Sequence, residues 1–193
     1  MQTEYEATFI KVDKEEMRTK FKLAGAKLIR PEFLQTRKVF DLPSGHEIAD
    51  GWLRVRDEGD KITMSLKIVG GKKIEDQKEL CLKIDNFEAA VELLKSIGCS
   101  QKAYQESRRE LWMIDDVEIT IDEWPFLEPF VEIEAKTEEE VKRISALLGF
   151  DYNQAIFCSV DTLYSQKYNI DKEVINHGTT KIVFDMDNPF EKK

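Results

Sequence analysis

Residues 130–136 read FVEIEAK, and their alternation of apolar and acidic side chains predicts a β-strand. Successive side chains of a strand point to opposite faces, so the apolar residues share one face while Glu132 and Glu134 share the other. Two carboxylates on one face lie about 7 Å apart and repel each other unless a cation lies between them. The stretch therefore predicts either a solvated outer face or a site for a metal ion, alone or together with a polyanion.

The same two-residue alternation recurs along the chain and predicts further half-buried strands. It is clearest in EYEATFI at 4–10, WLRVRDE at 52–58, ITMSLKIV at 62–69 and VEITIDEW at 117–124. Three other stretches also fit strands: KVFDL at 38–42, QKELCLKI at 77–84 and AYQESRRELWMI at 103–114. Together these stretches give about eight strands, which is enough to close a barrel.

Three helices are predicted between the strands, each with a polar residue at its start and a glycine at its end. Their starting signals are Asp13 with Glu16, Asn86, and Thr137 with Glu140. A pattern of two alternating glutamates, a short turn, a helix and a glycine occurs twice, at 4–26 and 131–150. One domain over residues 1–170 accommodates these elements, and residues 171–193 are expected to form a loosely packed, mobile tail.

At 193 residues and a formal net charge of −9, the chain is long enough for a single domain without disulfide bonds. The acidic balance argues against a broad surface for nucleic acid, although a local pocket lined by arginine can still attract phosphate. Cys81, Cys99 and Cys158 are an odd number at wide spacings, which favours a reducing cytoplasm over an oxidising compartment. No apolar run reaches the length of a membrane span, so we expect a cytoplasmic protein without a membrane partner.

Basic side chains also share strand faces. Arg54 and Arg56 alternate with apolar residues, and Lys67 lies on the polar face of the next strand. Arginine can bind phosphate through two parallel hydrogen bonds, whereas lysine acts as a compact point charge. Arg108 and Arg109 add two cations, one of which faces each way if their strand is regular. These residues predict phosphate contacts, with an ion pair on the barrel exterior as the alternative for Arg108.

Acidic residues occupy matching places in the two halves of the chain, where two pairs of glutamates and an aspartate lie on strand faces. Hard divalent cations take oxygen ligands, and Mg²⁺ is usually held by a few carboxylates together with substrate phosphates. For any single pair a solvated face is the alternative, because charged residues are mostly exposed. The two pairs combined with the basic set favour a site, whose acidic members are Glu4, Glu6, Asp122, Glu132 and Glu134.

In this order the motifs resemble those of the CYTH, or triphosphate tunnel, superfamily, which includes class IV adenylate cyclases, thiamine triphosphatases and inorganic triphosphatases. The resemblance covers residues 4–168. It rests on the ExE motif, the R-x-R strand, the lysine that follows, SRRELW at 107–112 and the late carboxylates. It implies an α+β fold with an antiparallel eight-stranded β-barrel and flanking helices. The inner wall of such a barrel binds a triphosphate through arginine and lysine, while acidic residues hold Mg²⁺ or Mn²⁺.

Carried onto this sequence, the resemblance implies two sets of site residues. The phosphate-binding residues are Arg54, Arg56, Lys67, Arg108 and Arg109, of which Lys67 and Arg109 are the expected catalytic cations. The metal ligands are Glu4, Glu6, Asp122, Glu132 and Glu134. The implied partner is a small-molecule triphosphate, such as ATP, tripolyphosphate or thiamine triphosphate, and assembly into an oligomer is left open.

The expected function is that of a divalent-metal-dependent enzyme resembling class IV adenylate cyclases, which convert ATP into cyclic AMP and pyrophosphate. The alternatives are a triphosphatase acting on an inorganic or organic triphosphate, and a non-catalytic triphosphate or polyphosphate sensor. Two departures from the family pattern bear on this choice: Thr8 replaces the signature lysine, and Val39 replaces a tyrosine of many relatives. In thiamine triphosphatase-like members these positions are associated with water activation, so their replacement argues against that hydrolysis and leaves triphosphate binding intact.

Overall fold

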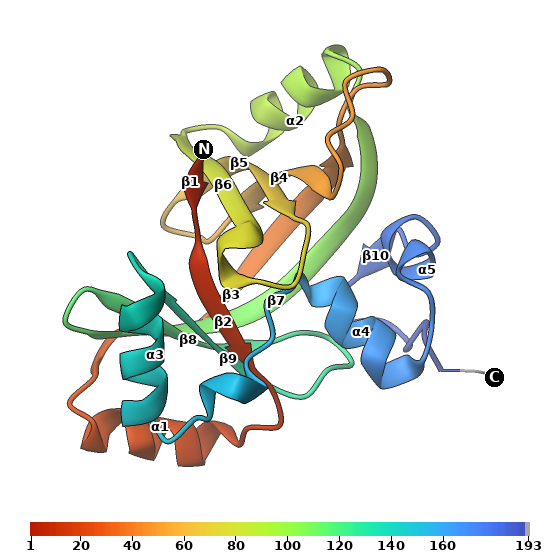
Figure 1. The fold of residues 1–193 in the computed structure, drawn as a ribbon. Coiled ribbons are helices and arrows are strands. Elements are labelled where there is room, and N and C mark those ends of the chain that lie inside the picture. The colour runs from red at the N-terminus through yellow and green to blue at the C-terminus, as the bar shows by residue number, and fades with distance from the viewer. Residues whose placement is uncertain (192–193) are drawn as a thin grey trace.

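The computed structural model describes residues 1–191, and its centre is one strongly curved sheet (Figure 1). The strands are β1 (Gln2–Thr3), β2 (Tyr5–Phe9), β3 (Lys27–Asp41), β4 (Gly51–Asp57), β5 (Ile62–Val69), β6 (Gln77–Ile84), β7 (Ser100–Ile114), β8 (Val117–Glu123), β9 (Phe130–Ala135) and β10 (Lys181–Ile182). Their order is β1-β6-β5-β4-β3-β7-β8-β9-β2, with β10 added beside β7. Register shifts interrupt the pairing of the long strands β3 and β7, and such irregularities let strands bend around a barrel.

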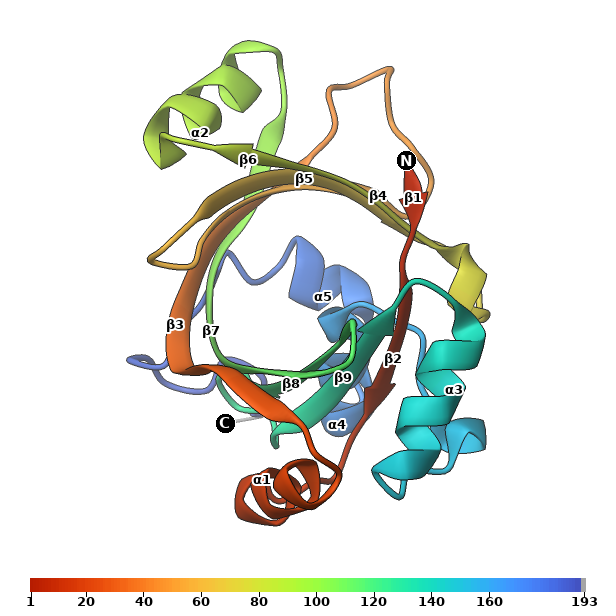
Figure 2. The same ribbon diagram turned by 90° about the vertical axis from the view of Figure 1, so that its left-hand side faces the viewer.

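The N-terminal segment closes the barrel. It carries β1 and β2 on either side of Glu4; β1 pairs with β6, whereas β2 pairs with β9 at the other end of the strand order. Between them the Glu4 amide donates a hydrogen bond to the Gln77 carbonyl oxygen at 3.0 Å. The view along the axis shows the resulting ring (Figure 2). The expected antiparallel barrel is therefore confirmed, with nine strands along the path rather than eight because one chain segment is divided at Glu4.

The helices before residue 150 lie on the outside of this ring, and those after residue 159 lie across its opening (Figure 2). They are α1 (Lys14–Leu23), α2 (Phe87–Ser96), α3 (Glu138–Leu147), α4 (Val160–Tyr168) and α5 (Lys172–Asn176), with short 3-10 turns η1 (Ile74–Asp76) and η2 (Tyr152–Gln154). The expected caps are confirmed, because the side chains of Asp13, Asn86 and Thr137 each accept a hydrogen bond from a first-turn amide. Such bonds satisfy amides that have no partner within the helix. None of the helices within residues 1–191 has the length and apolar character needed to cross a membrane.

Strand alternation sends apolar side chains outward to the helices and polar side chains into the barrel. Ala7, Ile119 and Ile133 on β2, β8 and β9 are fully buried, in the apolar cluster that also includes residues of α1 and α3. Phe40 and Val55 on β3 and β4 are fully buried in a second cluster with residues of α2. The two apolar cores therefore lie against the outer face of the barrel wall, and its interior is lined mainly by polar residues.

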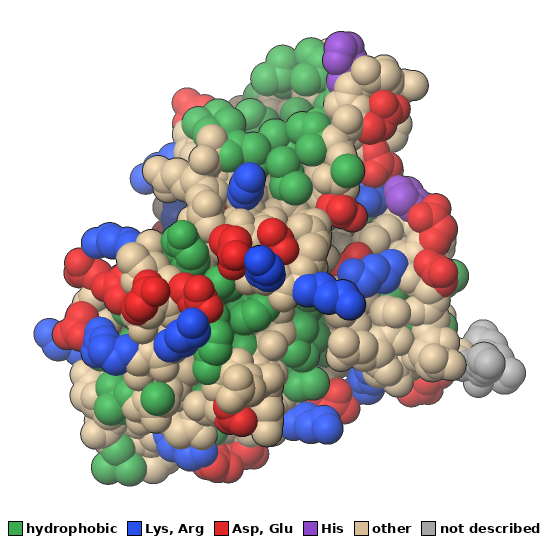
Figure 3. Space-filling model, viewed as in Figure 1, with side chains coloured by type: hydrophobic (Ala, Val, Ile, Leu, Met, Phe, Trp, Pro, Cys, Tyr) green, Lys and Arg blue, Asp and Glu red, His purple; other side chains and the backbone are tan. Residues whose placement is uncertain are grey.

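Apolar side chains that remain exposed gather at the end of the molecule that carries α2 (Figure 3). Leu80 and Leu82 on β6 are about half exposed, as are Leu93 and Ile97 on α2. Charged side chains of both signs dominate the surface over α1 and α3 in the same view (Figure 3). On the face shown, the α2 end is thus the more apolar part of the surface.

The C-terminal segment packs against the barrel, contrary to the expectation of a loose tail after residue 170. Strand β10 pairs in parallel with β7, and Ile175, Ile182 and Phe190 are at most 6% exposed. They belong to one apolar cluster with Trp124 and Tyr164. The expectation was wrong because these short apolar stretches show no long periodicity, and their burial depends on the barrel surface beside them. The domain boundary at residue 170 stays a prediction.

Replacing Ile182 with alanine should lower the free energy of unfolding by about 2–5 kcal/mol, because the side chain is fully buried and its truncation leaves a cavity. Val174→Ala on α5 is the control, because Val174 is 48% exposed and its truncation should cost about 0.5 kcal/mol or less. Urea unfolding followed by circular dichroism measures both values. Small and equal changes would contradict the packing of this segment.

Candidate functional site

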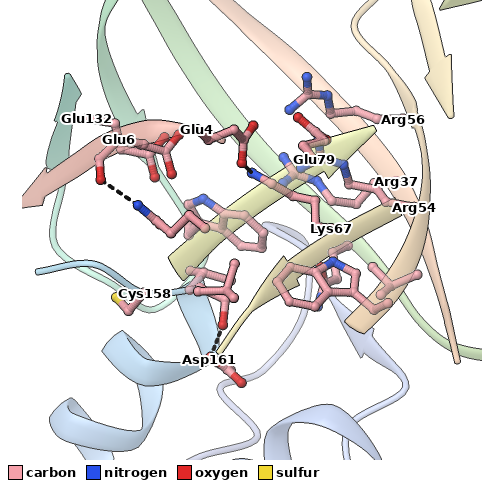
Figure 4. A pocket seen from close by; sticks show the side chains of 18 of the residues that line it. Glu4, Glu6, Arg37, Arg54, Arg56, Lys67, Glu79, Glu132, Cys158 and Asp161 are labelled. Atoms are coloured by element: carbon pink, nitrogen blue, oxygen red, sulfur yellow. Dashed lines mark hydrogen bonds and ion pairs between the residues drawn. The ribbon is translucent and has the colours of Figure 1, made fainter. Parts of the chain in front are cut away.

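A cavity of about 180 Å³ lies inside the barrel, and charged side chains of both signs line it (Figure 4). The basic side chains come from β3, β4, β5 and β7: Arg37, Arg54, Arg56, Lys67, Lys102 and Arg109. The acidic side chains come from the N-terminal segment, β6, β9 and α4: Glu4, Glu6, Glu79, Glu132, Glu134 and Asp161. The fold therefore brings most of the sequence-predicted site residues together and adds several that were not expected.

Four guanidinium groups gather in this cavity. Arg54 and Arg56 share a face of β4 by alternation, and Arg37 lies opposite Arg56 in the β3–β4 register. Burial, followed by the charges of Arg54, Arg56 and Arg109, lowers the pKa of Arg37 well below its usual value. Arg37 donates a hydrogen bond to Gln35 Oε1 at 2.9 Å, and no carboxylate of residues 1–191 forms an ion pair with it. The group therefore carries a positive charge that the described side chains do not balance.

Two other cations have carboxylate partners. Arg54 Nη2 lies 3.0 Å from Glu79 Oε1, and Lys67 Nζ lies 2.9 Å from Glu4 Oε2. Burial lowers the pKa of Lys67, but the carboxylates of Glu6 and Glu4 outweigh burial, so the pKa is raised and the lysine stays charged. These pairs restrict the side chains of Arg54 and Lys67, so both cations are already oriented in the cavity before a ligand arrives.

Arg109 is held by two carboxylates. Its Nε and Nη2 donate to the two oxygens of Asp122 at 2.7 and 2.8 Å, and Nη2 also donates to Glu132 Oε2 at 2.6 Å. Burial disfavours the charged arginine, but Asp122 and Glu132 outweigh burial and raise the pKa of Arg109 well above its usual value. Asp122 is fully buried and does not line the cavity. The oxygens of Asp122 therefore orient Arg109, and the expected role of Asp122 as a metal ligand stays a prediction.

Four glutamates crowd the wall where the N-terminal segment meets β9. Glu6 lies opposite Glu134 in the β2–β9 register, and Glu4 and Glu132 line the same cavity. Burial, followed by the charge of Glu6, raises the pKa of Glu134 to about 7 and that of Glu132 well above its usual value. Burial also raises the pKa of Glu4 to about 8, against the opposing charge of Lys67. Crowded carboxylates of this kind are stabilised by a cation, so their chemistry fits a divalent metal ion.

The glutamates do not form a complete metal cage. Within residues 1–191 no three Asp, Glu, His or Cys side chains are grouped so that they could hold an ion by themselves. Mg²⁺, however, is usually bound by one or two carboxylates together with waters and substrate phosphates. The wall therefore fits an ion that is shared with a bound phosphate, and the side chains available to it are Glu4, Glu6, Glu132 and Glu134.

Arg108 lies outside the cavity and forms an ion pair, the arrangement that the sequence left open as the alternative to phosphate contact. It lies 3.6 Å from Glu123 in an ion pair and stacks over the Phe184 ring, 4.2 Å from the centroid. The β7–β8 register is regular at this point, with Arg108 opposite Glu123 and Arg109 opposite Asp122. Because neighbours on a regular strand face opposite ways, the inward position of Arg109 directs Arg108 outward.

Sequence reasoning missed several polar residues that line the cavity, among them Arg37, Glu79, Lys102, Asp161 and Asn176. Arg37 directly precedes the stretch 38–42, where the alternation was recognised, so it fell outside the expected strand. Glu79 alternates with apolar neighbours in QKELCLKI as Arg54 does in its own strand, and this signal could have found it. Asp161 and Asn176 carry no comparable local signal, because only the docking of α4 and α5 brings them to the cavity.

The free energy of unfolding, measured without divalent cations, should fall as the pH rises from about 5 to 8. In the folded protein the pKa of Glu134 is about 7 rather than 4.5, so the folded state keeps a proton that the unfolded state has already lost. The stabilisation is therefore complete below the unfolded pKa and is lost as the pH passes 7. At about 1.4 kcal/mol per pKa unit, the change is on the order of 3 kcal/mol.

Glu134→Gln is the direct comparison, because glutamine has a similar size and does not titrate. The charged groups that act on Glu134 are Glu6, Lys67, Glu118 and Arg109. Unfolding curves of wild type and variant at five pH values should show a smaller slope in the variant. An identical slope in both proteins would assign the pH dependence to other groups.

Solved structures resemble this chain across most of its length. The PH1012 protein from Pyrococcus horikoshii OT3 is 25% identical, with a TM-score of 0.67 and coverage of 83% of this chain and 98% of that chain. A candidate adenylate cyclase from Vibrio parahaemolyticus has a TM-score of 0.71 at 13% identity and covers 85% and 98% of the two chains. A candidate adenylyl cyclase from Hippeastrum, for which a dominant triphosphatase activity is described, has a TM-score of 0.54 at 13% identity, covering 90% and 99%.

Sequence comparison gives the family. No curated protein matches the sequence. The family model of the CYTH domain matches residues 2–147, which is well over half of the chain and includes every strand from β1 to β9. The expected resemblance is thereby confirmed, and with its closed barrel and charged interior this chain belongs to the CYTH domain family.

Proposed function

We propose that this protein binds a triphosphate inside the barrel and catalyses a reaction at one of its phosphorus atoms. The observation that carries the proposal is the buried guanidinium group of Arg37, which forms no ion pair with a carboxylate of residues 1–191 and lies beside three other arginines. A buried charge is costly unless it is paired, and a guanidinium group pairs well with phosphate oxygens. A triphosphate presents several adjacent negative groups, which a row of guanidinium groups can bind together.

The phosphate-binding side chains in this proposal are Arg37, Arg54, Arg56, Lys67 and Arg109. Charge-assisted hydrogen bonds from them would fix the phosphate chain along the cavity. Lys67 and Arg109 are the proposed catalytic cations, because positioned charges stabilise the negative charge that develops on phosphate oxygens as a P–O bond breaks. Their own carboxylate partners, Glu4 for Lys67 and Glu132 for Arg109, keep them oriented.

The carboxylate wall is where we place Mg²⁺ or Mn²⁺, held by residues from Glu4, Glu6, Glu132 and Glu134. Such an ion would supply positive charge that neutralises part of the charge on the phosphate oxygens. The raised pKa values of Glu132 and Glu134 support the placement, because these carboxylates are under-compensated by the cations around them. The glutamates also orient Arg109 and Lys67, so the wall contributes to phosphate binding as well.

Cyclisation of ATP is the reaction that we favour. The ribose 3′-hydroxyl oxygen would bond to the α-phosphorus as the bond from that phosphorus to the bridging oxygen breaks, with pyrophosphate leaving and the hydroxyl proton passing to solvent. The nucleophile belongs to the substrate and is positioned by binding alone. Val39 lines the cavity and Thr8 is buried on β2, and neither side chain takes up a proton at neutral pH to activate water.

Hydrolysis is the second candidate, because the Hippeastrum protein of similar fold has a dominant triphosphatase activity. Water would then attack the terminal phosphorus and release orthophosphate, with the same arginines holding the substrate. A non-catalytic triphosphate sensor would need only the binding residues. The reactions share one set of charges, so the products have to distinguish them.

The proposed partner is a small-molecule triphosphate, and the proposal requires neither nucleic acid nor a membrane. The binding charges lie inside the barrel, where duplex nucleic acid could not reach them. Cys81, Cys99 and Cys158 are free thiols, which fits the reducing cytoplasm that we propose as the location.

Product analysis tests the reaction. With Mg²⁺ or Mn²⁺ the wild type should convert ATP to cyclic AMP and pyrophosphate, release little orthophosphate from tripolyphosphate, and stop when EDTA is added. The double variant Thr8→Lys with Val39→Tyr should gain hydrolysis, because general base assistance contributes about 10²–10⁴-fold when the geometry is right. Orthophosphate from tripolyphosphate without cyclic product from ATP would make the protein a triphosphatase. Binding without either product would make it a sensor.

Arg37→Met tests the phosphate site itself. Loss of charge-assisted hydrogen bonds, each contributing about 1.5–3 kcal/mol, should weaken tripolyphosphate binding by roughly tenfold to a hundredfold in calorimetry. The stability of the ligand-free protein should be kept or raised, because the variant removes a buried charge that lacks a carboxylate partner. Arg108→Met is the matched control and should bind normally, because Arg108 lies outside the cavity. Equal effects of the two variants would contradict the proposed site.

A further inference from the structure

The C-terminal segment supplies a third side of the cavity. Ser159, Asp161 and Asn176 line it from the start of α4 and the end of α5. Figure 4 shows Asp161 across the cavity from the arginines and from Glu4. These residues follow the part of the chain, 2–147, that the family model matches. They are therefore separate from the phosphate-binding motifs, and their contacts with a bound ligand have to be argued from their own chemistry.

Asp161 gives this side of the cavity a charge that repels phosphate. The side chain is 14% exposed, and Lys172 Nζ lies 3.3 Å from its Oδ1. Ser159 Oγ donates to Asp161 Oδ1 at 2.5 Å, and Asn176 Nδ2 donates to Oδ2 at 2.8 Å. A carboxylate oxygen has two lone pairs, so Oδ2 can accept a further hydrogen bond. Asp161 is thus a fixed acceptor that suits a donor group rather than an anion.

The N-cap residue of α4 uses its side chain to hold Asp161. Ser159 is the N-cap of α4, yet its side chain makes no cap hydrogen bond to the helix. Its hydroxyl donates to Asp161 instead. A serine at this position normally accepts from a first-turn amide, which stabilises the helix. Here the hydroxyl fixes the direction of the carboxylate beside the cavity.

Apolar side chains line the same cavity as Asp161. They include Trp52 on β4, Val39 on β3 and Val69 on β5. An inorganic polyphosphate gains nothing from an apolar wall, whereas an organic ring and the wall together remove apolar surface from water. The cavity therefore offers cations for phosphate, an apolar wall and, with Asp161, an acceptor of hydrogen bonds.

We propose that Asp161, with Asn176 beside it, binds the organic end of the substrate, and that this end is a flat heterocycle carrying an amino group. The inference rests on the proposed triphosphate site and names its substrate class. The amino group donates to Asp161 Oδ2 in a charge-assisted hydrogen bond while the phosphates contact the arginines. Asn176 uses its Nδ2 for Asp161, which leaves its side-chain oxygen as a second acceptor. An organic group without a donor leaves the carboxylate desolvated and is rejected.

Calorimetry with the full chain in EDTA, which prevents metal-dependent turnover, compares three ligands: ATP, purine riboside triphosphate, which is ATP without its amino group, and tripolyphosphate. The wild type should bind ATP about tenfold or more tightly than purine riboside triphosphate, as expected for one charge-assisted hydrogen bond. Asp161→Asn should reduce this preference to about threefold or less, because it removes the charge of the acceptor. Its affinity for tripolyphosphate should change little.

Asp185→Asn is the matched control, because it makes the same charge change at an exposed position of the C-terminal segment outside the cavity. It should keep the wild-type preference for ATP, and melting temperatures report any damage to the fold. Equal binding of ATP and purine riboside triphosphate by the wild type, with tripolyphosphate still bound, overturns the inference and leaves the proposed function standing. If the Asp161→Asn protein loses stability and its affinity for all three ligands, the role of Asp161 is structural, and the inference is overturned. Failure of the folded wild type to bind tripolyphosphate both in EDTA and with Mg²⁺ overturns the proposed function itself.

Discussion

The repulsion between four guanidinium groups gathered inside the barrel is the constraint on which the rest of this structure depends. Arg37 has three of these groups as neighbours, and its guanidinium also stacks over the Trp124 ring at 4.3 Å from the centroid. Burying like charges is unfavourable, so the fold must hold each group by other means. Glu79 restrains Arg54 and Asp122 restrains Arg109, while Arg37 is left to neutral partners. Such an arrangement of cations supports the proposal that the cavity binds an anion.

The same short segment closes the barrel and places the carboxylates of the site. The chain around Glu4 joins β6 to β9, and the register of β2 on β9 sets Glu6 opposite Glu134. A slip of one residue in that register would turn the carboxylates out of the cavity and the apolar residues into it. The apolar cluster under α1 and α3 prevents such a slip, since Ala7 and Phe9 are buried there. Apolar packing on the outer face of the wall thereby fixes the positions of the carboxylates on its inner face.

Different parts of the chain supply the two sides of the cavity, and each side offers a bound molecule different contacts. The arginines and glutamates belong to the strands that the family model matches, whereas Asp161 and Asn176 come from helices beyond it. Apolar packing of Tyr164 and Ile175 against Trp124 and Phe130 seats those helices, independently of any charge in the cavity. Phosphate recognition and recognition of an organic group can therefore be changed separately, because different contacts support them.

The sequence by itself determined the strands, the three capped helices, the alternation of Arg54 with Arg56 and the pairing of glutamates on one face, because all of these depend on local periodicity. Only the tertiary structure decided which faces turn inward. Alternation predicts that Arg108 and Arg109 point in opposite directions, but it does not say which of them enters the cavity. The contact of Asp122 with Arg109 was not apparent from the sequence, because it depends on the pairing of β7 with β8. The C-terminal segment looked loose because its burial comes from contacts with the distant barrel surface. Charge and alternation are properties of neighbouring residues, whereas inward direction, ion-pair partners and burial arise when segments far apart in the chain meet.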